Sequence, residues 1–306
     1  MFIALFTVSV LGLSLGSFVN LCVFRIPRGL SILRPASFCP SCRRSLRWRE
    51  LVPVLSFVVS GGRCRSCSAV ISLRYPYTEL LVAAIAVVFY LVEGASARYL
   101  YNLTFVILMA LIAFIDWQHL IIPNAIVAVG VVLGLVLILT FHPTAAFSHF
   151  VSSIGGFCAA LSILLLGSWL FKKPVMGFGD VKLSGLIALF LGFEDYLVSL
   201  WLAAVLGSIL GVTLKLVHSW KNMTELDAHP ARREGFPIRY VSRNISPIMD
   251  KGAIRDRWEG KGEILRNLLP ELKLPFGSFL SLTSSIVLVF SETIDHLLSS
   301  WLTWMQ

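Results

Sequence analysis

Long apolar runs separated by short polar stretches dominate the pattern of this 306-residue chain. A transmembrane helix needs about 20 predominantly apolar residues. Runs such as LVAAIAVVFYLV and VAVGVVLGLVLILT, extended by their neighbours, meet that requirement. The pattern therefore indicates an all-α polytopic membrane protein with about eight transmembrane helices. The predicted helices are 2–24, 77–93, 99–116, 121–141, 148–171, 181–192, 196–217 and 275–290.

The sixth predicted helix, 181–192, is too short to cross a bilayer alone. Its twelve residues rise about 18 Å, whereas the hydrocarbon core is about 30 Å thick. The preceding GFGD stretch must either extend the helix or dip inward beside a cavity, where irregular backbone is tolerated. We expect Gly177 and Gly179 to shape this bend and to leave room for another backbone. Asp180 would then lie below the cytoplasmic surface.

Two C-terminal stretches differ from spanning segments. The last residues, SETIDHLLSSWLTWMQ, place apolar side chains at helical spacing, which is typical of an amphipathic helix in a membrane interface. Residues 218–274 are polar and carry both charge signs. They predict a cytoplasmic insertion, which is either ordered and partly helical or a flexible basic segment at anionic lipid.

Composition and charge agree with this membrane topology. The chain is 57% hydrophobic and 14% charged, against about 25% charged residues in soluble domains. Its net charge of +9 comes from basic residues in three zones, at 25–74, 172–182 and 215–273. The positive-inside rule places these zones in the cytoplasm and both termini on the outer side. The positive charge is therefore no indication of a nucleic-acid partner.

Four cysteines follow the first predicted helix as two C-x2-C pairs, Cys39 with Cys42 and Cys64 with Cys67. Two such pairs supply four thiolates, which can close tetrahedrally around Zn²⁺. The spacer of 21 residues is slightly longer than the usual 15–20. Because the cytoplasm disfavours disulfides, we expect 25–76 to form a small domain stapled by a structural zinc ion. Metal-free or disulfide-linked cysteines are the alternative.

Asp116 and Asp180 each stand at the end of an apolar run on the predicted cytoplasmic side. An ionisable residue at such a place is costly, so it is a functional hypothesis by default. Two carboxylates held close share a proton, and one can then activate water while the other protonates a carbonyl. This is aspartyl-protease chemistry. The alternatives are a helix cap and the ion site of a transporter.

Glu79 lies just inside the second predicted helix, in the stretch RYPYTELL. It can serve either to bind a substrate ammonium group or to cap local backbone.

The motifs together resemble the type IV prepilin peptidases. They run in order from about residue 15 to residue 282, so the resemblance covers nearly the whole chain. The stretches that carry it are LGSFVNLCVFRIPRG, RPASFCPSC, GRCRSCSAVISLRYPYTELL, FIDWQHLIIPN, MGFGDVKL and LPFGSFLSL.

The resemblance implies a bifunctional enzyme of the bacterial inner membrane, with periplasmic termini and a cytoplasmic catalytic face. Asp116 and Asp180 would cut the basic leader from prepilins and type II secretion pseudopilins after a glycine. S-adenosylmethionine would then methylate the new N-terminal residue. The implied contributors to methyl transfer are Glu79, the zinc loop and the first-helix signature, which is Gly16, Ser17 and Asn20. No glycine-rich nucleotide-binding loop is visible, so the second activity rests on the resemblance alone.

The expected cofactors are therefore structural Zn²⁺ and S-adenosylmethionine, and the expected partners are prepilin substrates and the lipid bilayer. The expected division of the chain is a first transmembrane helix, the zinc-binding domain, a transmembrane catalytic core, the insertion, and a last transmembrane helix with its amphipathic extension. These parts are 1–24, 25–76, 77–217, 218–274 and 275–306.

The chain departs from the family pattern near its C-terminus. About 50 polar residues precede LPFGSFL, where the family has a shorter connection, and Ser278 stands where the family often has proline. An ion-coupled transporter and a non-enzymatic pilus or secretion assembly factor are the alternative functions. Neither requires the aspartate motifs and the cysteine loop to occur together.

Overall fold

The computed structural model describes residues 2–228 and 275–304. The chain separates into two compact units, one made of Met1–Ala204 with Pro275–Gln306 and the other of Val205–Leu274. In the second unit the described part is residues 205–228, the C-terminal two thirds of one helix. The described residues form helices and two isolated β-bridges but no β-strand.

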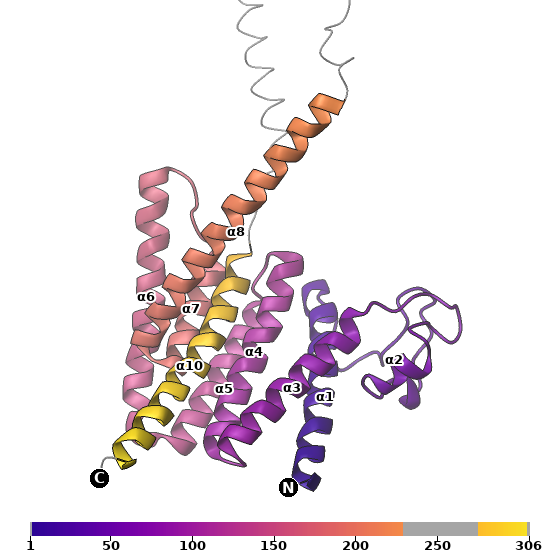
Figure 1. The fold of residues 1–306 in the computed structure, drawn as a ribbon, viewed down its shortest axis with the longest axis horizontal. Helices are drawn as coiled ribbons and strands as arrows, with labels where there is room; N and C mark the ends of the chain where they lie inside the picture. The colour runs from indigo at the N-terminus through magenta and orange to yellow at the C-terminus, as the bar shows by residue number, and fades with distance from the viewer. Residues whose placement is uncertain (1, 229–274, 305–306) are drawn as a thin grey trace, which may run out of the picture. The chain divides into compact units, whose positions relative to one another are not determined.

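Long helices make up most of the described chain. The long helices α1, α3, α4, α5, α6 and α7 run in alternating directions, which brings the predicted cytoplasmic ends together (Figure 1). The long helices are α1 (Phe2–Arg25), α3 (Arg74–Glu93), α4 (Ala97–His119), α5 (Asn124–Phe141), α6 (Ala146–Phe171), α7 (Phe178–Leu191), α8 (Phe193–Ala228) and α10 (Phe276–Trp304). The short ones are η1 (Ile26–Arg28), η2 (Trp48–Glu50), α2 (Leu55–Val59) and η3 (Pro143–Ala145).

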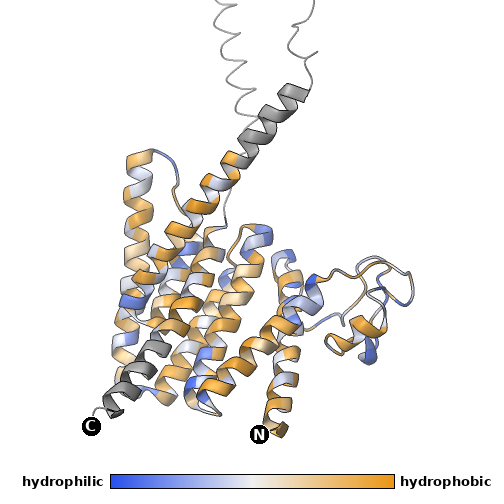
Figure 2. Cartoon of the chain, viewed as in Figure 1, coloured by the Kyte–Doolittle hydropathy of each residue, from blue (hydrophilic) through white to orange (hydrophobic). Residues whose placement is uncertain are grey.

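Six helical segments of the described chain are long and apolar enough to cross a membrane. They are Phe2–Arg28, Arg74–Glu93, Ala97–His119, Asn124–Phe141, Pro143–Phe171 and Phe193–Leu214. Apolar residues cover the helices, and hydrophilic residues gather at helix ends and in the cysteine loop (Figure 2). The prediction of an all-α polytopic membrane protein is confirmed. The expected number of about eight spans also counts α7 and the apolar start of α10, which are shorter, so that number stays a prediction.

Helix α7 begins at Phe178, three residues before its predicted start. The reason is local, because the Asp180 carboxylate accepts the Gly177 N–H at 3.2 Å, while the Asp180 N–H donates to the Gly177 carbonyl at 3.1 Å. These two bonds close the first turn. The GFGD stretch therefore extends the helix, which at 14 residues rises about 21 Å.

Helices α8 and α10 also extend beyond their predicted ends. Glu194 and Asp195 lie in the first turn of α8, where the positive end of the helix dipole favours acidic residues. Helix α10 continues to Trp304 because no glycine or proline follows Gly277. The stretch predicted as an amphipathic interface helix is thus the second half of α10. Of the predicted insertion, 229–274 lies outside the described residues.

Short as it is, α7 is deeply buried, and α6 covers one side of it. Ser153 of α6 donates to the Gly185 carbonyl at 2.9 Å. A Cβ on Gly156 would lie 2.5 Å from the Ala188 Cβ, so the two helices touch almost backbone to backbone. This close packing fixes the position of α7, and with it the position of Asp180.

A second close contact joins α1 to α3. A Cβ on Gly12 would lie 2.6 Å from the Ala83 Cα, and one on Gly16 would lie 2.6 Å from the Glu79 Cα. Small residues four apart are a common solution for membrane helices, because they let two backbones approach. Gly16, part of the first-helix signature, therefore serves packing, and the contact places Glu79 against α1.

Replacing Gly12 by valine is expected to lower the thermal unfolding midpoint in detergent by several degrees, because overpacking costs about 1–3 kcal/mol. Ser14→Val is the matched control, since it adds bulk to an exposed position of the same helix. Equal midpoints for the two variants, measured by intrinsic fluorescence, would contradict the close helix contact.

Candidate active site

Asp116 lies in the last turn of α4 and is only 5% exposed. An anion near a helix C-terminus is disfavoured by the helix dipole, so capping of its own helix does not explain this residue. Its stabilising contacts come from the start of α10. The Asp116 Oδ2 accepts the Ser278 N–H at 2.7 Å and the Ser278 hydroxyl at 3.1 Å.

Asp180 lies in the first turn of α7 and is 8% exposed. One of its oxygens, Oδ2, accepts the Gly177 N–H, so the helix-cap alternative describes part of what this side chain does. The other oxygen, Oδ1, faces Gly277. Capping therefore leaves half of the carboxylate available for other chemistry.

The two aspartates meet around Gly277. A Cβ built on this glycine would lie 3.0 Å from the Asp116 Oδ2 and 3.1 Å from the Asp180 Oδ1. The two oxygens are therefore no more than about 6 Å apart, the sum of those distances. The structure thus brings together two carboxylates that are 64 positions apart in the sequence, as the pair hypothesis requires.

Ile122, from the loop between α4 and α5, packs on two glycines of the site. A Cβ on Gly179 would lie 3.1 Å from the Ile122 Cβ, and one on Gly277 would lie 2.8 Å from the Ile122 Cδ1. The space at Gly179 is thus used by a side chain rather than by another backbone. Gly177 has an ordinary extended φ of −76°, so its backbone conformation is open to other residues.

A polar contact also joins the two aspartate motifs. The Lys182 Nζ donates to the Asn124 Oδ1 at 2.8 Å, and the same ammonium lies 4.8 Å from the centre of the Phe178 ring. Lys182 follows Asp180 by two positions, and Asn124 begins α5. The contact therefore fixes the start of α7 against the start of α5.

No role for Gly277, Ser278 or Ile122 was predicted from the sequence. LPFGSFLSL stood out as a motif, and a glycine directly inside a helix start was a usable signal for close approach. Which helices this glycine approaches was not readable, because residues far apart in the sequence supply the neighbours.

The cysteine pairs form a second cluster, in the loop between α1 and α3. The Sγ atoms of Cys39, Cys42, Cys64 and Cys67 all lie within 4.8 Å of one another. The four predicted ligands are thus brought together, and the cluster can hold a metal ion such as zinc. Arg44 pairs with Glu50 at 2.6 Å in the same loop.

Both cysteine pairs use the same turn. The Cys39 N–H donates to the Arg44 carbonyl, and the Cys64 N–H donates to the Ala69 carbonyl, each at 2.9 Å. The residue after the second cysteine is left-handed in both, with φ 57° at Arg43 and 58° at Ser68. Two equivalent turns facing each other are an arrangement that presents four sulfurs to one ion.

Backbone N–H groups favour thiolates in this cluster. The Cys42 N–H lowers the pKa of the Cys39 thiol. The N–H groups of Cys67 and Ser66 lower the pKa of the Cys64 thiol to about 6. At Cys67 the Ala69 N–H lowers the pKa, but burial and the neighbouring cysteines outweigh it and raise the pKa to about 11. The thiolate, the form that binds metal, is therefore favoured at Cys39 and Cys64 but not at Cys67.

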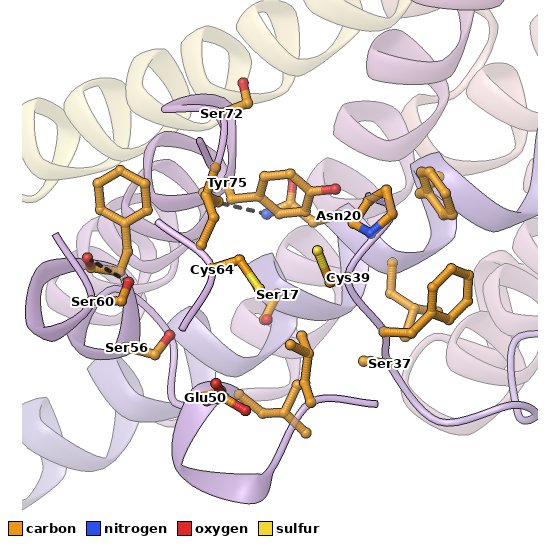
Figure 3. A pocket seen from close by; sticks show the side chains of 18 of the residues that line it. Ser17, Asn20, Ser37, Cys39, Glu50, Ser56, Ser60, Cys64, Ser72 and Tyr75 are labelled. Atoms are coloured by element: carbon orange, nitrogen blue, oxygen red, sulfur yellow. Dashed lines mark hydrogen bonds between the residues drawn. The ribbon is translucent and has the colours of Figure 1, made fainter. Parts of the chain in front are cut away.

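A cavity of about 710 Å³ lies between α1, the start of α3 and the cysteine loop (Figure 3). The side chains of Asn20, Cys39 and Cys64 are seen at this cavity in Figure 3. Neither Asp116 nor Asp180 lines it. The aspartate pair and this cavity are therefore two separate sites.

Asn20 and Glu79, the two residues implied for methyl transfer, line the same cavity. The Asn20 Nδ2 donates to the Tyr75 carbonyl at 3.0 Å. The Glu79 Oε2 accepts the Val54 N–H at 2.7 Å. Glu79 thus binds local backbone, which is one of its two expected roles. Val54 has a φ of 58°, an unfavourable conformation for valine that this hydrogen bond stabilises.

Comparisons with known proteins match the chain in two regions, one with the cysteine cluster and the other with the two aspartates. The profile of the bacterial peptidase A24 N-terminal domain matches residues 10–92, and that of the type IV leader peptidase family matches 103–212. A Bacillus subtilis protein named prepilin leader peptidase/N-methyltransferase is 30% identical over 239 residues, which are 76% of this chain and 92% of that protein. The chain belongs to the type IV leader peptidase family.

Other members with the same name support the assignment. The Pseudomonas putida protein is 34% identical over 237 residues, 69% of this chain and 81% of its own length. The Myxococcus xanthus protein is 32% identical over 207 residues, 68% of this chain and 62% of its own length. No solved structure matches the chain. Both aspartates fall in the second matched region and the cysteines in the first, whereas Gly277 and Ser278 lie outside both.

Changing Cys39 and Cys64 together to serine removes one ligand from each pair and is expected to abolish zinc binding and lower the unfolding midpoint. Metal content per chain, measured by mass spectrometry on the purified protein, checks this. Cys158→Ser is the control, because this exposed cysteine lies outside the cluster. A double variant that keeps one zinc ion per chain would rule out these ligands.

Proposed function

We propose that this protein is a membrane aspartyl endopeptidase that removes the leader peptide from type IV prepilins and type II secretion pseudopilins, and that it then methylates the new N-terminus. The observation that carries the peptidase part is the buried pair Asp116 and Asp180, with one oxygen of each about 3 Å from the same point beside Gly277. The names of the relatives agree with both activities.

The peptidase chemistry follows from that geometry. One carboxylate takes a proton from a water molecule, whose oxygen attacks the scissile carbonyl carbon, while the other carboxylic acid donates its proton to the carbonyl oxygen. The tetrahedral intermediate then breaks its C–N bond, and a proton passes to the leaving amine. The pair ends with one shared proton, as it began, and no covalent intermediate forms.

The burial of the pair favours this reaction over ion transport. Each carboxylate is already engaged by the chain, Asp116 by Ser278 and Asp180 by Gly177. A cation between the two facing oxygens would meet the Asp116 Oδ2, which two Ser278 donors already occupy. Membership in a peptidase family also makes the transporter and the non-enzymatic assembly factor the less favoured alternatives.

The methyl-transfer site is proposed to be the cavity beside the cysteine loop. Its volume suits a nucleoside-sized cofactor, and the buried Glu79 offers a carboxylate to an ammonium group. S-adenosylmethionine would supply the methyl group there. Asn20 and Glu79 would orient the reactants, since both are held by backbone contacts.

Zinc fits the four thiolates as a structural ion. A four-cysteine site leaves no open position for chemistry, so its role would be to hold the loop that forms one wall of the cavity. Removing zinc would then reduce methylation indirectly, by loosening the loop that lines the cavity. The metal itself would not contact the substrate.

Both sites are proposed to lie at the cytoplasmic face of the bacterial inner membrane, with the termini periplasmic; the basic zones support this orientation through the positive-inside rule. A site at the cytoplasmic face suits a substrate with a basic leader and an apolar helix, because the bond to be cleaved lies where the leader meets the membrane. The lipid bilayer and the prepilin are the partners this proposal requires.

Asp116→Asn and Asp180→Asn are each expected to reduce leader removal below detection, because each leaves the pair without one carboxylate. Mass spectrometry of a prepilin incubated with each purified variant measures this. Bound zinc and the unfolding midpoint should match the wild type, which shows that the fold is intact. Normal cleavage by either variant would sink the peptidase assignment.

Glu79→Gln is expected to reduce methylation of an already processed pilin at least tenfold and to leave leader removal unchanged, because Glu79 lines the cavity and not the aspartate pair. The measurement is transfer of a labelled methyl group from S-adenosylmethionine. Equal loss of both activities would mean that the two sites are not separate.

A further inference from the structure

The start of α10 enters the aspartate pair from a part of the chain that neither family profile covers. Gly277 and Ser278 are both buried there. Gly277 lies beside one oxygen of each aspartate, and Ser278 donates to Asp116. A third element therefore completes a site whose two carboxylates come from α4 and α7.

Ser278 makes the two aspartates different from each other. Its N–H and its hydroxyl both point at the Asp116 Oδ2, so this oxygen is an acceptor and favours the ionised carboxylate. The hydroxyl also lies 3.0 Å from the Ala113 carbonyl, and its single proton can serve either acceptor. The backbone N–H has no such alternative and stays on Asp116.

Asp180 has the complementary arrangement. Its Oδ2 accepts the Gly177 N–H, whereas its Oδ1, which faces Gly277, takes part in none of the hydrogen bonds of the described chain. The helix dipoles alone would favour charge on Asp180, at the start of α7, over Asp116, at the end of α4. The two donors on Asp116 against one on Asp180 outweigh this and favour the shared proton on the Asp180 Oδ1, which faces Gly277.

Gly277 leaves open the point at which the reaction has to occur. A Cβ there would lie 3.0 Å and 3.1 Å from the two facing oxygens, which is hydrogen-bond distance from both. It would also lie 2.8 Å from the Ile122 Cδ1, the end of a side chain that has to turn aside when a reactant enters. A water molecule or a scissile carbonyl oxygen needs that same position. Gly277 lies in a helix, where alanine is intrinsically the better residue, so the requirement for glycine comes from the site and not from the backbone.

We propose that the first turn of α10 is a positioning element of the peptidase site, in which Ser278 holds Asp116 as the general base and Gly277 keeps the reaction point open. Asp180 then serves as the general acid. This proposal rests on the proposed peptidase function and adds the division of roles between the aspartates.

Ser278 gives the first test. Proline, which the family often has at this position, would remove both the N–H and the hydroxyl donor. Ser278→Pro is expected to lower kcat roughly tenfold at nearly constant KM and to move the acidic limb of the pH–rate profile upward by about one unit. Ser278→Ala, which keeps the N–H, should shift it less, and Ser278→Thr, which keeps both donors, should restore the wild-type profile. A proline variant with a wild-type kcat and pH profile would overturn the proposal.

A merely structural role for Ser278 predicts a different result. It would lower the unfolding midpoint and kcat without moving the acidic limb, and that outcome would also overturn the role assigned to Asp116. Proline is tolerated in the first turn of a helix, so the variant is expected to fold and to keep its zinc.

Gly277→Ala gives the second test. The added methyl group is expected to reduce leader removal at least 100-fold, while bound zinc and methylation of an already processed pilin stay at wild-type levels. The unfolding midpoint is expected to fall only slightly, because the overlap is with the end of the Ile122 side chain, which can turn aside. Wild-type cleavage by this variant would contradict the open-point role. If Asp116→Asn or Asp180→Asn cleaves normally, the proposed function itself fails; if both are inactive and the α10 variants match the wild type, only the present inference fails.

Discussion

Burying two carboxylates in an apolar helix bundle is the constraint on which the rest of this structure depends. A carboxylate taken out of water needs hydrogen-bond donors, and a second one nearby raises the cost further. The chain meets this need with backbone N–H groups at two helix starts, Gly177 before α7 and Ser278 in α10. Each donor must be held in place, so the close packing of the surrounding helices is tied to the site.

That dependence explains why so many contacts near the pair involve glycine or small residues. Gly156 brings α6 against α7, Gly179 accepts the side chain of Ile122, and Gly277 reaches the gap between the aspartates. Lys182 and Asn124 join the two motifs that carry the carboxylates. Small shifts in any of these contacts would move an oxygen relative to its donor, and a loosely packed bundle could not keep the pair aligned.

Much of this arrangement was predictable from the sequence. Apolar runs gave the order of the helices, and C-x2-C spacing gave the four sulfurs that now lie within 4.8 Å. Asp116 and Asp180 were predicted as a pair because an ionised carboxylate in apolar surroundings is energetically costly and therefore indicates a functional residue. Local hydrogen bonds that a hydropathy pattern does not contain set the exact helix starts, as at Gly177. The role of Gly277 was hidden because it depends on which helices meet, and that is a property of the tertiary structure.

The position of Gly277 and Ser278 in the chain also bears on how the enzyme matures. Both aspartates have been synthesised by residue 180, yet Gly277 and Ser278, which contact them, come only after the long polar stretch that precedes α10. A nascent chain at that stage contains the acidic groups without their alignment. On the roles proposed for these residues, catalytic competence would therefore arrive only with the last helix, late in biosynthesis.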